Sequence, residues 1–261
     1  MHPILFHLGP VTFYTYGVLV ALAFVIGTLW TLKRAKSAGE DPDTYLEGVF
    51  WILVAGFVGA RLLYVVYFPD MYLHQPLRIV LDRGGLVWYG GLVGAMLATL
   101  AFVKFRHISL PKFGDIVLPP AALGLAVGRI GCLMSGCCYG RPTHLPWGIQ
   151  FPPGHETYPM WVHPTQLYES GSLIVLTLLL AWLYPRVKTP GIVMSLFFIG
   201  YGLIRFVIEF YRGDVVYWVG HALTASQVFS LLGILGGLIC LAVFKKQATS
   251  LTIRYASNTE R

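Results

Sequence analysis

Long apolar segments separated by short polar ones run along most of this chain. The apolar segments are about 18 residues or longer and carry almost no charge, which is the length an α-helix needs to cross the hydrocarbon of a bilayer. A transmembrane β-barrel would instead alternate apolar and polar residues one by one. The pattern therefore predicts an all-α polytopic membrane protein. Seven transmembrane helices are expected, at residues 12–32, 47–68, 86–105, 115–134, 166–184, 191–211 and 225–244.

Composition agrees with this pattern, since 56% of the 261 residues are hydrophobic and only 12% are charged. The net charge of +7 would be compatible with a nucleic-acid partner, but the basic residues are distributed unevenly between the two sets of connections. One set holds twelve: Lys33, Arg34, Lys36, Lys104, Arg106, Lys112, Arg186, Lys188, Lys245, Lys246, Arg254 and Arg261. The other set holds four: Arg78, Arg83, Arg141 and Arg212. This positive-inside bias predicts an external N-terminus, a cytoplasmic C-terminus and no nucleic-acid partner.

The domain organisation expected from the sequence is simple. Residues 1–246 are predicted to form one seven-helix transmembrane domain, followed by a polar cytoplasmic tail at 247–261. The N-terminus has no basic region and no A-x-A cleavage site, so the first span is predicted to be a retained helix.

Three arginines lie inside the predicted spans: Arg61, Arg129 and Arg205. Glu209 follows Arg205 by four residues, so the two share a helix face and can pair. Glu169 lies at the outer end of the fifth span. Ionisable residues inside a membrane are candidate functional residues, but they can also form buried ion pairs that hold a bundle together. For Arg61 the structural interpretation is favoured; for Arg129 and Arg205, which lie beside glycines, the functional one is favoured.

Arginine in the outer half of a membrane helix suits phosphate binding, because its planar guanidinium can donate to two phosphate oxygens at once. Glycines allow close backbone approach and leave N–H groups available to an anion. They recur in GRIG, in GCCYGR and in RGGLVWYGGLVG. The candidate anion-binding glycines are Gly90, Gly91, Gly131 and Gly140. The alternative for GGLVG is close packing between helices through small residues.

Cys132, Cys137 and Cys138 stand at the outer end of the fourth span, and several interpretations are open. Cys132 can form a disulfide with one of the other two. A metal site that also uses His144, His155 or His163 is conceivable, although the spacing is irregular. The thiols can also be inert packing residues, or one can be catalytic. Cys240, within the last span, is predicted to fill space.

Most aromatic residues near the outer boundary are expected to form an interfacial belt. Tyr16, Tyr89 and Tyr201 are each followed by glycine. Their hydroxyls can hydrogen-bond a lipid head group, or the rings can simply pack.

Six of these stretches together resemble the bacterial prolipoprotein diacylglyceryl transferase family. The similarity covers nearly the whole chain, with the blocks in the family's order. The blocks are YG at Tyr16, GARL around Arg61, RGGLVWYGGLVG, GRIGCLMSGCCYGR, VHPTQLYES and GYGLIRFVIEFYRGD.

The resemblance implies a seven-helix protein of the bacterial cytoplasmic membrane that needs no metal and no cofactor. Its implied activity moves the diacylglyceryl group of phosphatidylglycerol to the lipobox cysteine of a preprolipoprotein signal peptide, with release of glycerol phosphate. The implied catalytic residues are Arg129 and Arg205, to which we add Tyr89. The implied substrate-binding residues include Tyr16, Tyr201 and Gly140. From their positions we add Gly90, Gly91, Gly131, Cys137 and Glu209 to the substrate-binding set.

The chain departs from the family's usual pattern at three positions. Tyr89 stands where the family usually has histidine, Cys132 where it has asparagine and Cys137 where it has glutamate. A phenol ordinarily titrates near pKa 10 and is therefore almost fully protonated at neutral pH, so it replaces an imidazole base poorly. The departures leave open a relative that binds phospholipid or lipoprotein without catalysis, and a transferase with a different acceptor.

Overall fold

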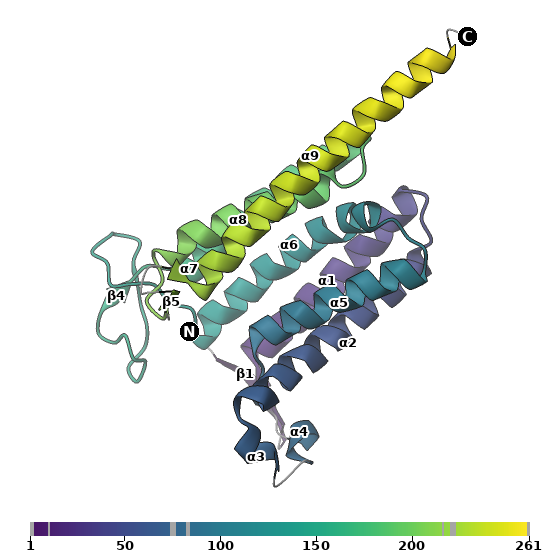
Figure 1. Ribbon diagram of the computed structural model, residues 1–261. Helices are drawn as coiled ribbons and strands as arrows, with labels where there is room; N and C mark the ends of the chain where they lie inside the picture. Colours follow the sequence, from purple (N-terminus) through teal and green to yellow (C-terminus); the bar gives the residue numbers. More distant parts are fainter. Residues whose placement is uncertain are drawn as a thin grey trace. The chain divides into compact units, whose positions relative to one another are not determined.

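The computed structural model describes residues 3–9, 11–73, 77–81, 84–215, 217–219 and 223–259, and within them it is largely helical (Figure 1). Two positions discussed above, Arg83 and Arg261, lie outside the described residues. The helices are α1 (Thr15–Ser37), α2 (Pro42–Tyr67), α3 (Pro69–Leu73), α4 (Arg78–Leu81), α5 (Trp88–Phe105), α6 (Leu110–Ser135), α7 (Thr165–Leu183), α8 (Ile192–Glu209) and α9 (Ala225–Thr259), with a 3-10 turn η1 (Tyr184–Arg186). The strands form three short antiparallel pairs: β1 (Ile4–Leu8) with β2 (Val11–Tyr14), β3 (Ile149–Gln150) with β4 (Trp161–Val162), and β5 (Tyr217–Val219) with β6 (Leu223–Thr224).

Seven of the described helices are long and apolar enough to cross a membrane, which confirms the predicted number and the predicted helical class. These segments are Thr15–Ser37, Pro42–Tyr67, Trp88–Phe105, Leu110–Ser135, Thr165–Arg186, Ile192–Glu209 and Ala225–Gln247. Several ends of the apolar segments lie up to five residues from the predicted ones, and the first span, predicted at 12–32, differs at both ends. Residues 12–14 belong instead to β2, where Val11–Tyr14 pairs with β1, and the helix continues to Ser37.

The described chain divides into two compact units. One unit comprises residues 1–30 and 114–261, and the other comprises residues 31–113. α1 and α6 contribute to both. The candidate arginines Arg129 and Arg205 belong to the first unit, whereas Tyr89 belongs to the second.

In the first unit, α8 packs against both α7 and α9. Apolar side chains of α6, α7 and α8 pack together in its core: Ala122, Ala126, Leu173, Leu176, Leu180, Val193 and Phe197. Asp115, which is buried, fixes the start of α8. Its carboxylate oxygens accept hydrogen bonds from the backbone N–H groups of Gly191 and Met194, both at 2.7 Å. A helix start leaves backbone N–H groups without helical partners, and this carboxylate supplies two acceptors for them.

In the second unit, α2 and α5 approach closely through glycines. A Cβ added at Gly90 would lie 2.6 Å from the Cβ of Leu63, and closer still to the carbonyl oxygen of Gly59. A Cβ added at Gly91 would lie 3.2 Å from the carbonyl oxygen of Gly56. The GGLVG stretch therefore packs two helices together, as the structural alternative predicts.

Arg61 has a structural role of a different kind from the predicted ion pair. Its guanidinium donates to the backbone carbonyl oxygens of Arg78 (2.8 Å), Ile79 (2.7 Å), Gly84 and Gly85 (3.0 Å). Arg61 therefore ties the segment that precedes α5 to α2. Carbonyl dipoles accept from the buried guanidinium here, so the structural interpretation of Arg61 holds with carbonyls in place of a carboxylate.

Candidate active site

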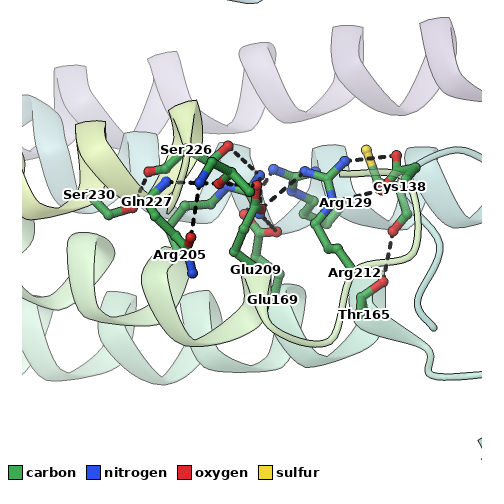
Figure 2. A network of polar contacts seen from close by, with 12 residues as sticks. Arg129, Cys138, Thr165, Glu169, Arg205, Glu209, Arg212, Ser226, Gln227 and Ser230 are labelled. Carbon is green, nitrogen blue, oxygen red and sulfur yellow. Dashed lines mark hydrogen bonds and ion pairs between the residues drawn. The ribbon is translucent and has the colours of Figure 1, made fainter. Parts of the chain in front are cut away.

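A chain of alternating charges crosses the first unit, and it is drawn in close-up in Figure 2. Glu169, on α7, lies between two arginines. Arg129 Nη2, from α6, is 2.9 Å from Glu169 Oε1, and Arg205 Nη1, from α8, is 3.5 Å from Glu169 Oε2. Arg205 Nη2 is also 2.9 Å from Glu209 Oε2, one helical turn further along α8. Three helices are thus joined through two carboxylates and two guanidinium groups.

The chain of charges continues beyond the end of α8 through Arg212. Arg212 Nη1 lies 3.6 Å from Glu209 Oε2, and its Nε and Nη2 donate to the two oxygens of Asp214 at 2.9 and 2.8 Å. The start of α9 contributes polar partners as well, because Arg205 Nη2 donates to Ser226 Oγ at 3.0 Å. Thr224 Oγ1 donates to Glu209 Oε1 at 2.7 Å.

Burial differs along this charge chain. The Glu169 and Glu209 side chains are 3% and 4% exposed, and Arg205 is 11% exposed, whereas Arg129 is 19% exposed. Within the described part of the chain, Glu169 Oε1, Arg205 Nη1 and Glu209 Oε2 have close opposite charges but no hydrogen bond of good geometry. Buried polar atoms normally find such a partner. These atoms therefore retain hydrogen-bonding capacity at the centre of the site.

The outcome is mixed for the predicted charged residues. The Arg205–Glu209 pair is confirmed. Arg129 and Arg205 both prove to be ion-paired, and they share Glu169, which the sequence did not identify as the residue that joins them. Arg212, assigned only to an external connection, also belongs to the network. The sequence signals were a carboxylate inside a span at Glu169 and the compact EFYRGD stretch around Arg212.

The segment after α6 is fastened to the start of α7. The Cys137 carbonyl oxygen accepts from Gln166 Nε2 at 2.8 Å, and the Cys138 carbonyl oxygen accepts from Thr165 Oγ1 at 2.7 Å. Cys138 also interacts electrostatically with Arg129 and Arg212. The cysteine segment is therefore adjacent to the exposed end of the charge network.

A pocket of about 440 Å³ opens beside this segment, lined by Tyr14, Tyr16, Gly17, Ser135 and Cys137. Two of the predicted substrate-binding residues, Tyr16 and Cys137, thus line one open pocket. Gly131 makes the approach of α1 possible, because a Cβ there would lie 3.0 Å from the ring of Tyr16. Arg129 is near enough to interact electrostatically with Tyr16.

Tyr201 lies on α8 within hydrogen-bonding reach of Arg129. Its ring stacks on Phe197, with centroids 5.8 Å apart. The structure therefore brings Tyr201 to the same arginine that the sequence associated with phosphate binding.

Tyr89, Gly90 and Gly91 belong to the second unit, at the start of α5. Gly90 is buried against α2, and Trp88 lies edge-on to Tyr89 with ring centroids 5.4 Å apart. The structure explains the two glycines by helix packing. A part for these three residues in substrate binding or catalysis stays a prediction.

The thiols of Cys132, Cys137 and Cys138 lie within 4.8 Å of one another, and all four cysteines are free. Two of the three histidines considered as further ligands, His155 and His163, have other contacts. His155 Nε2 lies 2.8 Å from the Gly136 carbonyl oxygen and its Nδ1 lies 2.9 Å from Thr157 Oγ1, while His163 Nδ1 lies 3.2 Å from the Tyr168 hydroxyl.

Two ionisable groups outside the membrane-spanning helices have a pKa that this network shifts. Hydrogen bonds from the neighbouring thiols, with the positive charges of Arg212 and Arg129, hold the pKa of the Cys138 thiol well below its usual range. Burial opposes the charged form of Arg212, but its hydrogen bonds to Asp214 and the charge of Glu209 raise the pKa of that guanidinium. Positive charge from these two arginines therefore contributes to the environment of Cys138.

Gly140 is the point at which the segment after the cysteines packs against His163. A Cβ added at Gly140 would lie 2.5 Å from the His163 Cβ, and closer to its carbonyl oxygen. Gly140 also bridges to Arg212 as an isolated antiparallel pair. We expect Gly140→Ala to lower the free energy of unfolding by about 2 kcal/mol through overpacking, measured by thermal unfolding in detergent.

The matched control is Gly171→Ala. Gly171 lies within α7, and among the described residues no heavy atom beyond the neighbouring backbone of its own helix comes within 4 Å of the position of an added Cβ. Alanine there should leave stability unchanged or raise it by up to about 1 kcal/mol, because a helix interior favours alanine over glycine. Equal melting temperatures for the two variants would contradict the packing role of Gly140.

Together these groups form a half-buried site in which arginines and carboxylates alternate, with an open pocket beside it. Arg129 is partly exposed, with a carboxylate on one side and a phenol within reach. Such a site can bind a phosphate ester and stabilise the negative charge of a departing phosphate oxygen.

Comparison with known proteins agrees with this chemistry. The family model described as prolipoprotein diacylglyceryl transferase matches residues 3–243. A phosphatidylglycerol–prolipoprotein diacylglyceryl transferase of Clostridium tetani is 34% identical over 251 residues, covering 95% of this chain and 100% of the relative. The Bordetella avium protein of the same description is 35% identical, covering 95% of this chain and 96% of its own length. That of Finegoldia magna is 36% identical, covering 89% and 91%.

Proposed function

Because this chain belongs to the prolipoprotein diacylglyceryl transferase family, we propose that it transfers the diacylglyceryl group of phosphatidylglycerol to the lipobox cysteine of preprolipoproteins. The observation that supports this most directly is the partly exposed guanidinium of Arg129, tied to Glu169 and adjacent to a cavity-lining segment. A phosphodiester head group is the kind of ligand that such a group binds.

The protein is a multi-pass membrane protein of bacterial type, and we place it in the cytoplasmic membrane. The charge bias of the connections supports an external N-terminus and a cytoplasmic C-terminus. In that orientation the charge network and the cysteine segment lie towards the outer leaflet. Phosphatidylglycerol and a preprolipoprotein signal peptide would then reach the site from the membrane, and residues 1–246 would act as one transmembrane domain.

The transfer is a displacement at carbon. The lipobox thiol gives up its proton to water, its sulfur forms a bond to glyceryl C3, and the bond from that carbon to the phosphate oxygen breaks. Glycerol phosphate leaves with the electron pair of the broken bond. An ordinary cysteine with pKa near 8.5 is only a few per cent thiolate at neutral pH, so nearby cations that favour the thiolate speed the reaction.

We propose roles for these residues from their positions in the charge network. Arg129 binds the phosphate and stabilises its developing charge. Arg205, more deeply buried and held by both Glu169 and Glu209, acts mainly by positioning Glu169, which in turn holds Arg129. Tyr201 hydrogen-bonds the phosphate or glycerol oxygens from the Arg129 side, and Tyr16 does so from the cavity wall with Gly131 behind its ring.

Incubation of the purified protein with phosphatidylglycerol and a lipobox peptide tests the proposed reaction. We expect the peptide to gain the mass of one diacylglyceryl group, with release of an equal amount of glycerol phosphate. A peptide whose lipobox cysteine is replaced by serine is the substrate control. Phospholipid or peptide binding without release of glycerol phosphate would instead identify a non-catalytic binding protein.

Tyr89 is tested in the same assay. We propose that its hydroxyl orients the head group, so Tyr89→Phe should slow transfer by about 10-fold, the effect of one lost hydrogen bond. Complete loss of transfer would make Tyr89 the base that activates the thiol. An unchanged rate would remove Tyr89 from the site.

A further inference from the structure

The three thiols at the end of α6 converge for a reason visible in the backbone. Gly136 has φ +78 and follows the last residue of the helix. The Gly136 N–H donates to the Leu133 carbonyl at 3.3 Å, and the Cys137 N–H donates to the Cys132 carbonyl at 3.1 Å. This pair of bonds defines a Schellman motif, in which the side chains at the positions of Cys132 and Cys137 meet.

Cys138 completes the cluster through an unusual backbone conformation. Its φ is +59, in the left-handed region that residues other than glycine seldom adopt. The hydrogen bonds of the Cys137 and Cys138 carbonyls to α7 hold this turn in place. The result is three sulfur atoms within 4.8 Å of one another, from residues that the helix end and the α7 contacts fix.

This spacing is close to that of a thiolate metal site. At a Zn–S distance of about 2.3 Å, tetrahedral geometry places sulfur ligands about 3.8 Å apart. Each pair of sulfur atoms therefore has to approach by about 1 Å or less to bind one ion. Cys137 is exposed and lines the pocket with Tyr14 and Tyr16, so an ion can enter and a fourth ligand position can face the cavity.

Charge around the cluster also suits a thiolate site. Arg129 and Arg212 interact electrostatically with Cys138. Three thiolates around a divalent ion carry a net charge of −1, which these two guanidinium groups attract although each is also paired with a carboxylate. A disulfide would use only two of the three sulfur atoms and would not account for the position of the third beside them.

We propose that Cys132, Cys137 and Cys138 bind one thiophilic divalent ion of the Zn²⁺ type, with water in the fourth position. On binding, the three thiols release three protons and their sulfur atoms each donate an electron pair to the ion; no group is oxidised. The site lies in the wall of the Tyr16 pocket. A bound ion would therefore narrow the pocket and slow diacylglyceryl transfer, a consequence that rests on the proposed function.

Titration of the reduced, detergent-purified protein with Cd²⁺ tests binding without any need for transfer activity. Thiolate coordination to Cd²⁺ gives an ultraviolet charge-transfer band, which should saturate at one ion per chain. Competition between the protein and a chromogenic chelator for Zn²⁺ then gives the affinity. Cys137→Ser is the main variant, because this exposed residue can be changed with little effect on packing, and it should weaken Zn²⁺ binding by at least about 100-fold.

Cys132→Ser and Cys138→Ser should weaken binding similarly, whereas Cys240→Ser, a cysteine of α9 outside the cluster, should leave it unchanged. Melting temperatures of all four variants show whether any loss reflects unfolding. Absence of the charge-transfer band in the reduced wild type, or unchanged affinity in Cys137→Ser, would overturn the proposal. So would a disulfide that persists under reducing conditions, detected as two reactive thiols instead of four.

The two proposals fail separately. If the protein binds Cd²⁺ but transfers no diacylglyceryl group, the metal site stands and the proposed function is ruled out. An active transferase that gives no charge-transfer band with Cd²⁺ would support the proposed function and rule out the metal site.

Discussion

Arg129→Gln is expected to slow diacylglyceryl transfer by about 100- to 1,000-fold, the loss typical of removing one group that stabilises transition-state charge. Three arginines are paired with Glu169 or Glu209. The Arg129 side chain is the most exposed of them, at 19%, against 11% for Arg205 and 14% for Arg212. Glutamine is polar but shorter, and it has neither the charge nor the two-pronged donor. The measurement is the single-turnover rate of peptide modification at saturating phosphatidylglycerol.

Two further variants show whether the loss is specific to the site. Arg129→Lys retains the charge without the planar fork, so its rate should fall between those of wild type and Arg129→Gln. Arg106→Gln removes a 51%-exposed arginine whose partner is Glu47, and it should leave the rate unchanged. Full transfer by a folded Arg129→Gln variant would contradict phosphate binding by this residue.

The spans could be predicted because each depends on local sequence alone: about 20 apolar residues must cross the bilayer wherever their neighbours lie. The first span was misplaced at its start because residues 12–14 are apolar enough to continue a helix. They pair with β1 instead, and hydropathy does not record pairing with a second strand.

The site was predictable where it depends on helix geometry and not where it depends on packing. Arg205 and Glu209 share a face of one helix, so spacing was sufficient. Glu169 meets Arg129 and Arg205 only because α6, α7 and α8 come together, and these residues are 36 or more positions apart. Sequence spacing contains no information on that meeting.

The glycines show a different limit. Close helix packing and anion binding both require a residue without a side chain, so GGLVG was compatible with either. The close backbone of α2 explains Gly90 and Gly91 by helix packing. Gly131 and Gly140 instead make close contacts within the unit that contains the charge network, with Tyr16 and His163 respectively. A short motif can therefore be recognised before its physical reason is known.

Glu169→Gln is expected to lower the free energy of unfolding by about 3 kcal/mol, because it leaves buried positive charge with one carboxylate fewer. Glu169 is 3% exposed and contacts two arginines, and only Arg205 has another carboxylate, Glu209. For a chain of this length the loss corresponds to a decrease in melting temperature of about 6–12 °C. Thermal unfolding in detergent measures it.

Glu47→Gln is the matched control, since Glu47 is 36% exposed and pairs with the exposed Arg106. Such a surface pair contributes at most about 1 kcal/mol. In the double variant Arg129→Gln/Glu169→Gln, one charge of each sign is removed, so part of the stability lost in Glu169→Gln should return. Unchanged melting of Glu169→Gln would show that the carboxylate does not compensate the arginines.

The two substitutions together separate the structural and functional interpretations of the buried arginines. After Arg129→Gln, Glu169 still faces Arg205, so the protein should lose transfer much more than stability. After Glu169→Gln, both should fall, because Arg129 loses its tether and the bundle loses its central carboxylate. If the arginines served only to hold the helices together, Arg129→Gln would instead lower stability first, and its transfer rate would recover once the protein was stabilised.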